Sequence, residues 1–140
     1  MELRHITTLA ELRAEKANWD DLWRRSEVAI PTGKAEPTAQ WLEAFAPRAP
    51  LDVFVVEHQG AWVAALPLYR RRIARVVPVL DLIGNSWSPC GGLLLDPRCD
   101  VPRVTEALLR GLRGVEETLL WLEGVPPRSE ERRVGKECRL

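Results

Sequence analysis

The sequence predicts an α+β fold, a layered α/β domain in which helices flank a mostly antiparallel sheet. Two amphipathic segments precede a β-hairpin at residues 51–72, and a further helix and strand follow it. Both hairpin strands are apolar on both faces, so each face of the sheet is expected to be covered. With 140 residues, 46% of them hydrophobic, the chain is long enough for one domain with its own core.

The hairpin at residues 51–72 is the element around which the rest of the predicted fold is arranged. In its first strand one face carries Leu51, Val53 and Val55, and the other carries Phe54 and Val56. In its second strand one face carries Trp62, Ala64, Leu66 and Leu68, and the other carries Val63, Ala65 and Tyr69. Gly60 supplies the positive φ that a tight turn needs. Pro67 cannot donate to a ladder, so it predicts an edge, a bulge or a splayed strand end.

Two helices are predicted before the hairpin. Thr8 and Glu11 fit a capping box that opens a helix running to about Ser26. Its predicted buried face consists of Leu12, Trp19, Leu22 and Trp23. After a loop at residues 29–37, Thr38 is predicted to cap a short second helix that Pro47 ends.

One helix and three short strands are predicted after the hairpin. The strands are expected at residues 76–83, 92–95 and 118–122, with a Gly-, Asn-, Ser- and Pro-rich loop across residues 84–97. Asp100 is predicted to cap a helix that Gly114 ends. The predicted buried face of this helix is Val101, Val104, Leu108 and Leu112.

Composition excludes several classes of partner and site. The formal net charge of zero gives no argument for nucleic acid or an anionic membrane. No apolar run is long enough to span a bilayer, and the charged N-terminus does not resemble a signal peptide. Cys90, Cys99 and Cys138 are odd in number and lack C-x-x-C spacing, so neither a disulfide framework nor a metal site is predicted. We expect a reduced cytoplasmic protein.

The end of the chain has an unusual sequence. Residues 128–139, RSEERRVGKECR, resemble one reading frame of a short-read sequencing adapter, and only Leu140 departs from it. The expected division is therefore a natural part at residues 1–127, ending near Pro127, and an adapter-derived tail at residues 128–140. The alternative is a genuine basic tail.

Four stretches of the natural part carry a family resemblance. They are LRAEKANWDDLWRRS, PTAQWLEAF, VFVVEHQGAWVAALPLYRRR and VLDLIGNSWSPCGGLLLDP. They resemble the N-terminal half of a bacterial GNAT-like acetyltransferase family, whose members are described as cellulose-biosynthesis-associated or FemAB-like. The resemblance covers nearly all of residues 9–127 and implies transfer of an acyl group, usually acetyl from acetyl-CoA, to an amine. Full-length members resemble two GNAT-type halves, so it also implies that this chain lacks a C-terminal partner half.

The junction at residues 93–109 departs from the pattern that the family uses for CoA. GNAT enzymes hold the CoA pyrophosphate on an R/Q-x-x-G-x-G/A loop, where a helix N-terminus offers free N–H groups to an anion. Here the junction contains no glycine, Asp96 and Asp100 add negative charge, and Pro102 removes a donor. We therefore expect no CoA to bind this chain and the fragment alone to be inactive, with the CoA loop in the missing half.

The candidate acceptor groove consists of Ser86, Trp87 and Ser88 together with Arg71. An aromatic ring flanked by hydroxyls in a loop after a strand can stack on a ligand and hydrogen-bond it. The alternative is a turn held by one buried tryptophan. The basic cluster at residues 70–75 either contacts a phosphate or acidic acceptor, or is a solvated strand end.

No catalytic residue is assigned from the sequence. His5 and His58 have no Ser, Cys or carboxylate placed near them by a motif. Glu57, Asp81 and Asp96 are possible general bases, but no spacing favours one of them. Two functions follow: an N-terminal fragment of an N-acyltransferase, or a non-catalytic scaffold that binds the acceptor beside a partner half. A stand-alone anion-binding module is a third possibility, against which the zero net charge speaks.

Overall fold

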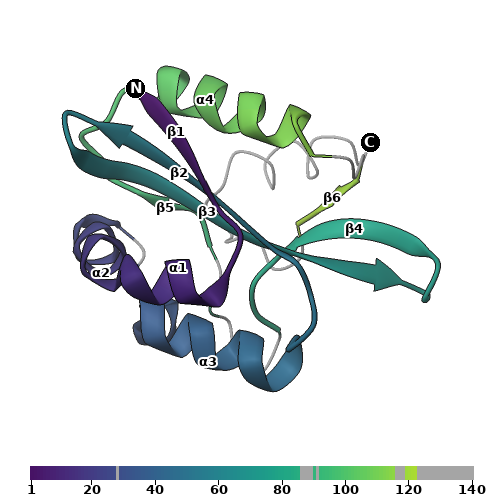
Figure 1. Ribbon diagram of the computed structural model, residues 1–140. Helices are drawn as coiled ribbons and strands as arrows, with labels where there is room; N and C mark the ends of the chain where they lie inside the picture. The colour runs from purple at the N-terminus through teal and green to yellow at the C-terminus, as the bar shows by residue number, and fades with distance from the viewer. Residues whose placement is uncertain (28, 86–89, 91, 116–118, 123–140) are drawn as a thin grey trace, which may run out of the picture.

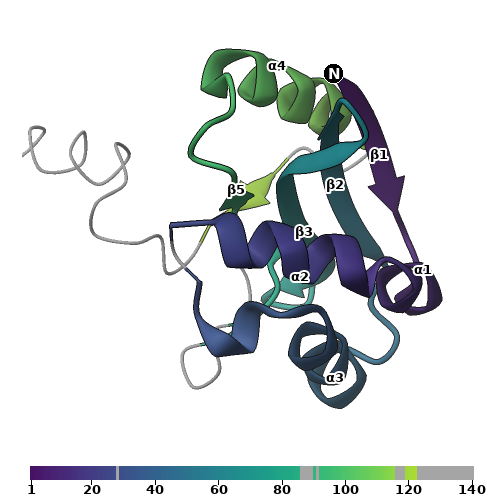
Figure 2. The ribbon, with the colours of Figure 1, turned by 90° about the vertical axis from the view of Figure 1, so that its left-hand side faces the viewer.

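A computed structural model describes residues 1–27, 29–85, 90, 92–115 and 119–122. These residues form a six-stranded sheet with α1, α2 and α3 on one face and α4 on the other (Figure 1). The turned view in Figure 2 shows the same layers, with α4 above the strands and α1–α3 below them. The predicted layered fold, a mostly antiparallel sheet flanked by helices, is confirmed.

The sheet is built around its longest strand. The strands are β1 (Glu2–Ile6), β2 (Leu51–His58), β3 (Ala61–Ile73), β4 (Val77–Leu82), β5 (Leu94–Leu95) and β6 (Leu120–Trp121). Their order is β1-β2-β3-β4-β6, and β5 pairs with the first part of β3. All pairs are antiparallel except β4 with β6, which is parallel.

Pro67 lies where β3 changes its outer neighbour. Ala64 and Ala65 pair with β5, whereas β4 begins to pair at Leu68. The Pro67 carbonyl accepts a hydrogen bond from the Ile83 N–H, so its nitrogen faces the same gap between the two partner strands. A proline is tolerated in this central strand because no ladder bond needs its missing N–H there.

The helices are α1 (Leu9–Ala14), α2 (Lys16–Arg25), α3 (Ala35–Phe45) and α4 (Val101–Arg113), with a 3₁₀ turn, η1, at Pro31–Gly33. The predicted capping box is present, because Glu11 N–H donates to the Thr8 hydroxyl and the Glu11 carboxylate accepts from Thr8 N–H. The Asp100 cap and the end of α4 at Gly114 are also confirmed. Val101, however, is exposed rather than part of the buried face.

Two helix predictions need correction. The single helix predicted from Thr8 to Ser26 is two helices, because the chain leaves helical geometry at Glu15 (φ −91°, ψ 12°). The helix predicted to start after Thr38 starts earlier, at Ala35. Pro37 is accommodated in its first turn, where its missing N–H has no intrahelical partner. The Asp20 carboxylate accepts from Ala35 N–H instead, and Thr38 lies fully buried inside the helix.

The predicted faces of the second hairpin strand are wrong at its start, because a β-bulge shifts the register. Val56 pairs with Ala64, but Glu57 pairs with Trp62, which leaves Val63 as the extra residue. Trp62 therefore faces α1–α3 and meets Trp19 edge to face, with ring centroids 6.4 Å apart. Val63 and Ala64 both face α4.

The N-terminal strand β1 was not predicted. It pairs with β2 in the register Leu3↔Val56 and His5↔Phe54, at the edge of the sheet. The alternation of Met1, Leu3 and His5 with charged residues is the period-two signal that could have found it. Its charged outer positions are typical of a protected edge strand.

The core is divided by the sheet into two clusters. The larger one lies under α1–α3 and contains Leu12, Trp19, Leu22, Trp41, Leu42, Val53, Val55, Trp62 and Tyr69 among its buried residues. The smaller one lies under α4 and is built around Phe54, Val56, Leu68, Leu80, Val104 and Leu108. Among the described residues, no helix is long and apolar enough to cross a membrane.

Candidate functional site

Of the predicted acceptor groove, only Arg71 lies in the described part of the chain. Ser86, Trp87 and Ser88 lie outside it. The Nε of Arg71 donates to Oδ2 of Asp81 at 2.6 Å, and Oδ1 of Asp81 accepts from Leu82 N–H at 2.8 Å. Asp81 is buried, with 6% of its surface exposed. Arg71 therefore belongs to a partly buried ion pair on the α1–α3 face of the sheet, beside Tyr69.

The arginines at residues 70–72 do not form one anion site. They follow one another along β3, so their side chains alternate between the two faces of the sheet. Arg70 pairs with Asp52, Arg71 with Asp81, and Arg72 donates to the Val76 carbonyl at 3.4 Å. Arg70 and Arg71 are thus held in ion pairs with buried carboxylates, which neither a phosphate site nor a solvated strand end describes.

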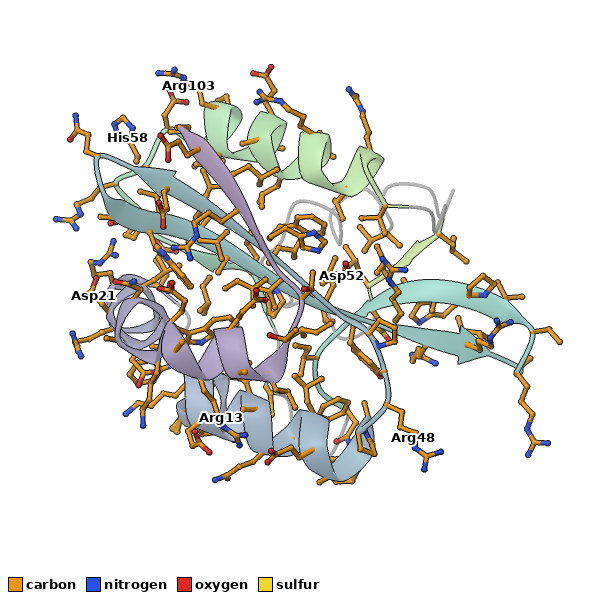
Figure 3. The ribbon with its side chains drawn as sticks, viewed as in Figure 1. Arg13, Asp21, Arg48, Asp52, His58 and Arg103 are labelled. Carbon is orange, nitrogen blue, oxygen red and sulfur yellow. The ribbon has the colours of Figure 1, made fainter. Side chains whose placement is uncertain are left out.

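A buried carboxylate joins three strands at a place that sequence reasoning missed. Asp52, with 1% of its surface exposed, accepts from Arg70 Nε at 2.6 Å and lies 2.7 Å from Nε2 of His5. The His5 ring stacks on Phe54, with centroids 4.6 Å apart. Figure 3 shows Asp52 in the middle of the molecule, whereas Arg48 and Asp21 lie at its periphery. No local motif predicts this contact, because His5 and Asp52 are 47 positions apart.

The strand-to-helix junction between β5 and α4 is organised around Asp96. This carboxylate is 5% exposed and forms an ion pair with Arg25, which comes from the end of α2. It also accepts from Arg98, through Nε and Nη2 at 3.1 Å each and through the backbone N–H at 3.0 Å. Arg25 in turn donates to the Trp62 carbonyl at 2.8 Å. An internal anion thus holds α2, β3 and the start of α4 together.

The backbone amides of this junction are mostly committed to internal partners. Asp96 N–H donates to the Val63 carbonyl, and Cys99 N–H donates to the Asp96 carbonyl. Arg103 N–H donates to the Asp100 side chain, while Val104 N–H donates to the Asp100 carbonyl. Pro97 and Pro102 have no N–H. Few amides therefore remain for a bound phosphate.

The charges of the junction also disfavour an anion. The hydrogen bonds from Arg98, together with that from Arg25, hold the pKa of Asp96 well below its usual range. The carboxylate is therefore ionised at neutral pH. Burial raises the pKa of the Cys99 thiol, and the negative charges of Asp96 and Asp100 add to the effect, so Cys99 is kept as a neutral thiol.

The pyrophosphate of CoA does not fit these residues. A GNAT-type junction offers free amides and a positive helix end to the phosphates. Here Arg25 and Arg98 are paired with the buried Asp96 carboxylate, and most backbone amides already donate to internal acceptors. The expectation that no CoA binds this chain stays a prediction. Among the described residues there is also no group of three or more His, Cys, Asp or Glu that could hold a metal.

Comparison with known proteins gives a fold but no family assignment. No model of a known protein family matches the sequence, and no curated protein does. Among solved structures, the chain is similar to the crystal structure of a ribosomal-protein-alanine N-acetyltransferase from Brucella melitensis biovar Abortus 2308. The TM-score is 0.54 at 13% identity, over 99% of this chain and 90% of that chain. This chain therefore shares the overall fold of that structure.

Proposed function

We propose that this chain is the N-terminal part of a GNAT-type N-acyltransferase that transfers an acetyl or acyl group from acyl-CoA to an amine. The observation that carries the proposal is the fold shared with an N-acetyltransferase over 99% of the chain. The reaction forms an amide and releases the CoA thiol. The acyl-CoA is held outside the residues described here, by a C-terminal half that follows residue 127 in the parent protein.

The acceptor amine is proposed to bind on the α1–α3 face, at the end of β4. Arg71 lies on this face in β3, and the loop with Ser86, Trp87 and Ser88 follows β4 in the sequence. Loops after sheet strands commonly carry binding residues, and a tryptophan between hydroxyls suits a polar ligand. The same proposal places the natural domain at residues 1–127 of a bacterial, cytoplasmic protein and treats residues 128–140 as adapter-derived.

A second candidate is a non-catalytic scaffold that binds the acceptor and supports a partner acyltransferase half. The observation that favours it is the junction filled by Asp96, with Arg25 and Arg98 as its partners. A domain without a phosphate site of its own can still form part of the cleft that binds the acceptor. In that case CoA binding and thioester chemistry both belong to the partner half.

The experiment that tests both candidates uses the parent protein, recovered by reassembling its gene from adapter-trimmed reads. We expect a glycine-rich R/Q-x-x-G-x-G/A loop downstream, and release of CoA thiol that depends on an added amine. Trp87→Ala and Arg71→Gln are expected to raise the KM for the amine and to leave the affinity for acyl-CoA unchanged. A parent that continues without such a loop and releases no thiol would refute the acyltransferase proposal.

A further inference from the structure

The two edges of the sheet differ in their chemistry. One edge is β1, which carries ionisable side chains at Glu2, Arg4 and His5, so a strand placed beside it would meet charges. The other edge is β6, which lies next to β4 (Figure 1), and residues 119–122 contain no charged residue and no proline. Within the part of the chain that the structure describes, no strand pairs with the outer side of β6. This edge therefore lacks the features that keep other chains from pairing with a sheet.

The pairing of β6 with β4 determines which backbone groups point outward. Leu80 N–H donates to the Leu119 carbonyl at 3.0 Å, and Leu120 is the register partner of Leu80. In a parallel pair, the residues on either side of the register partner make the bonds, so Leu119 and Trp121 face β4 with their backbone groups. These groups alternate in direction along a strand. Leu120 and Leu122 therefore each present an N–H and a C=O to the outside.

The side chains of this edge are apolar and exposed on both faces of the sheet. Leu120 lies beside Leu80 on the α4 face, and Trp121 lies beside Asp81 on the opposite face. The side chains of residues 119–122 are each 36–43% exposed. A strand added to β6 would thus bury apolar surface on both faces and satisfy the outward backbone groups at the same time.

The free edge is short, because β4 does not extend it. Leu80 N–H points toward β6, so the backbone of Pro78, two residues earlier, points to the same side. Proline has no N–H, and an added strand would find no donor there. The pairing surface is therefore limited to residues 119–122.

We propose that β6 pairs with β6 of a second copy of this chain, in antiparallel orientation about a two-fold axis at Trp121. In this register Leu120 of each copy lies opposite Leu122 of the other, and the two residues exchange both backbone bonds. Trp121 lies opposite Trp121 of the second copy. A second copy fits this edge because its donors and acceptors match themselves, and every cross-strand pair is apolar, so no like charges meet. The paired strands are the first step of the association that the exposed side chains favour.

Sedimentation velocity of the full chain tests the association. The interface is small, so we expect a dissociation constant of about 10–100 µM. Leu120→Pro removes an outward N–H and keeps the N–H of Trp121 that faces β4. It should raise the dissociation constant at least about tenfold and leave the melting temperature of the dilute chain unchanged. Leu109→Ala, which removes an exposed leucine from α4, is the control and should not change the dissociation constant.

Cysteine cross-linking tests the register. Directly opposed residues of a non-hydrogen-bonded antiparallel pair have Cα atoms about 4.5 Å apart, which is within the range for a disulfide. Trp121→Cys, in a chain that also carries Cys138→Ser, should therefore form a cross-linked dimer under mild oxidation. Thr105→Cys, at an exposed position of α4, is the matched control and should not.

Three results would overturn the inference. One is a wild-type chain that stays monomeric up to about 100 µM. Another is association that Leu120→Pro leaves unchanged, or cross-linking of Trp121→Cys that is no faster than that of Thr105→Cys, because the contact would then lie on another surface. The third concerns hydrogen exchange of the Leu120 and Leu122 amides, whose protection should rise with concentration. Equal protection in the dilute chain would show that a segment of the same chain covers this edge. Whether the parent protein transfers an acyl group affects none of these results.

Discussion

Replacement of Asp96 by asparagine tests whether an internal carboxylate holds the strand-to-helix junction. Asparagine keeps the shape and one acceptor oxygen but removes the charge that Arg25 and Arg98 surround. Breaking a fully buried pair costs about 3–5 kcal/mol, and exposed pairs contribute about 0–1 kcal/mol. The Arg25 side chain is 22% exposed and that of Arg98 is 77% exposed, so we expect a loss of about 2 kcal/mol. For a chain of this size, that lowers the melting temperature by about 6 °C.

The two arginines provide matched control variants. Arg98 lowers the pKa of Asp96 most, but its exposure to solvent screens the free energy that it contributes. Arg25→Gln should therefore destabilise the chain more than Arg98→Gln, in urea unfolding followed by circular dichroism. An Arg98→Gln variant as unstable as Arg25→Gln would refute the idea that the buried pair is the one that stabilises the junction.

The pH dependence of Asp96→Asn has a defined sign. The pKa of Asp96 is lower in the folded chain than in the unfolded chain, so its contribution is present above the unfolded pKa, about 4. It is lost as the pH falls from there toward the folded pKa. The stability difference between the wild type and Asp96→Asn should be constant from about pH 5 to 7 and shrink below about pH 4. A difference that grows in acid would contradict the reasoning.

Two further predictions concern packing and the sheet edge. A Cβ on Gly111 would lie 2.7 Å from Cδ1 of Phe54, whose buried ring stacks on His5. Gly111→Ala should therefore lower the free energy of unfolding by about 1–2 kcal/mol, although alanine has the higher helix propensity. Gly92→Ala is the control and should not lower it, because the space around its Cβ is open. The strand edge at residues 119–122 leaves large apolar side chains 36–43% exposed, namely Leu119, Leu120, Trp121 and Leu122. The chain should therefore aggregate, and Trp121→Lys should reduce its light scattering. A monodisperse wild-type monomer would argue against this.

The elements with strong local signals were predictable from the sequence. The Thr8 capping box, the Asp100 cap and the alternation of the first hairpin strand are short-range features, and each is confirmed. The bulge at Val63 could not be predicted, because it depends on register with β2 rather than on its own residues. The start of α3 was misplaced because Pro37 was interpreted as part of a loop although it fits a first helical turn.

The candidate site was less predictable than the fold, because its contacts are long-range. The absence of glycine and the extra acidic residues at residues 93–109 are visible in the sequence, and the poor phosphate site that they indicate stays a prediction. That Asp96 pairs with Arg25, 71 positions away, could only be seen in three dimensions. Similarly, the Thr38 hydroxyl and the Trp41 indole N–H have no hydrogen-bond partner within the described part of the chain, and no local pattern signals this, because it depends on what surrounds them. The groove at residues 86–88 stays a prediction.

Titration of the chain with acetyl-CoA shows whether the acyl donor is held outside the described residues. Because Asp96 fills the junction, we predict no change in melting temperature at up to millimolar acetyl-CoA. Asp96→Ala frees Arg25 and Arg98, and this variant should be stabilised by inorganic pyrophosphate more than the wild type is. Clear stabilisation of the wild-type chain by micromolar acetyl-CoA would contradict the account, because it would place the donor site within these residues.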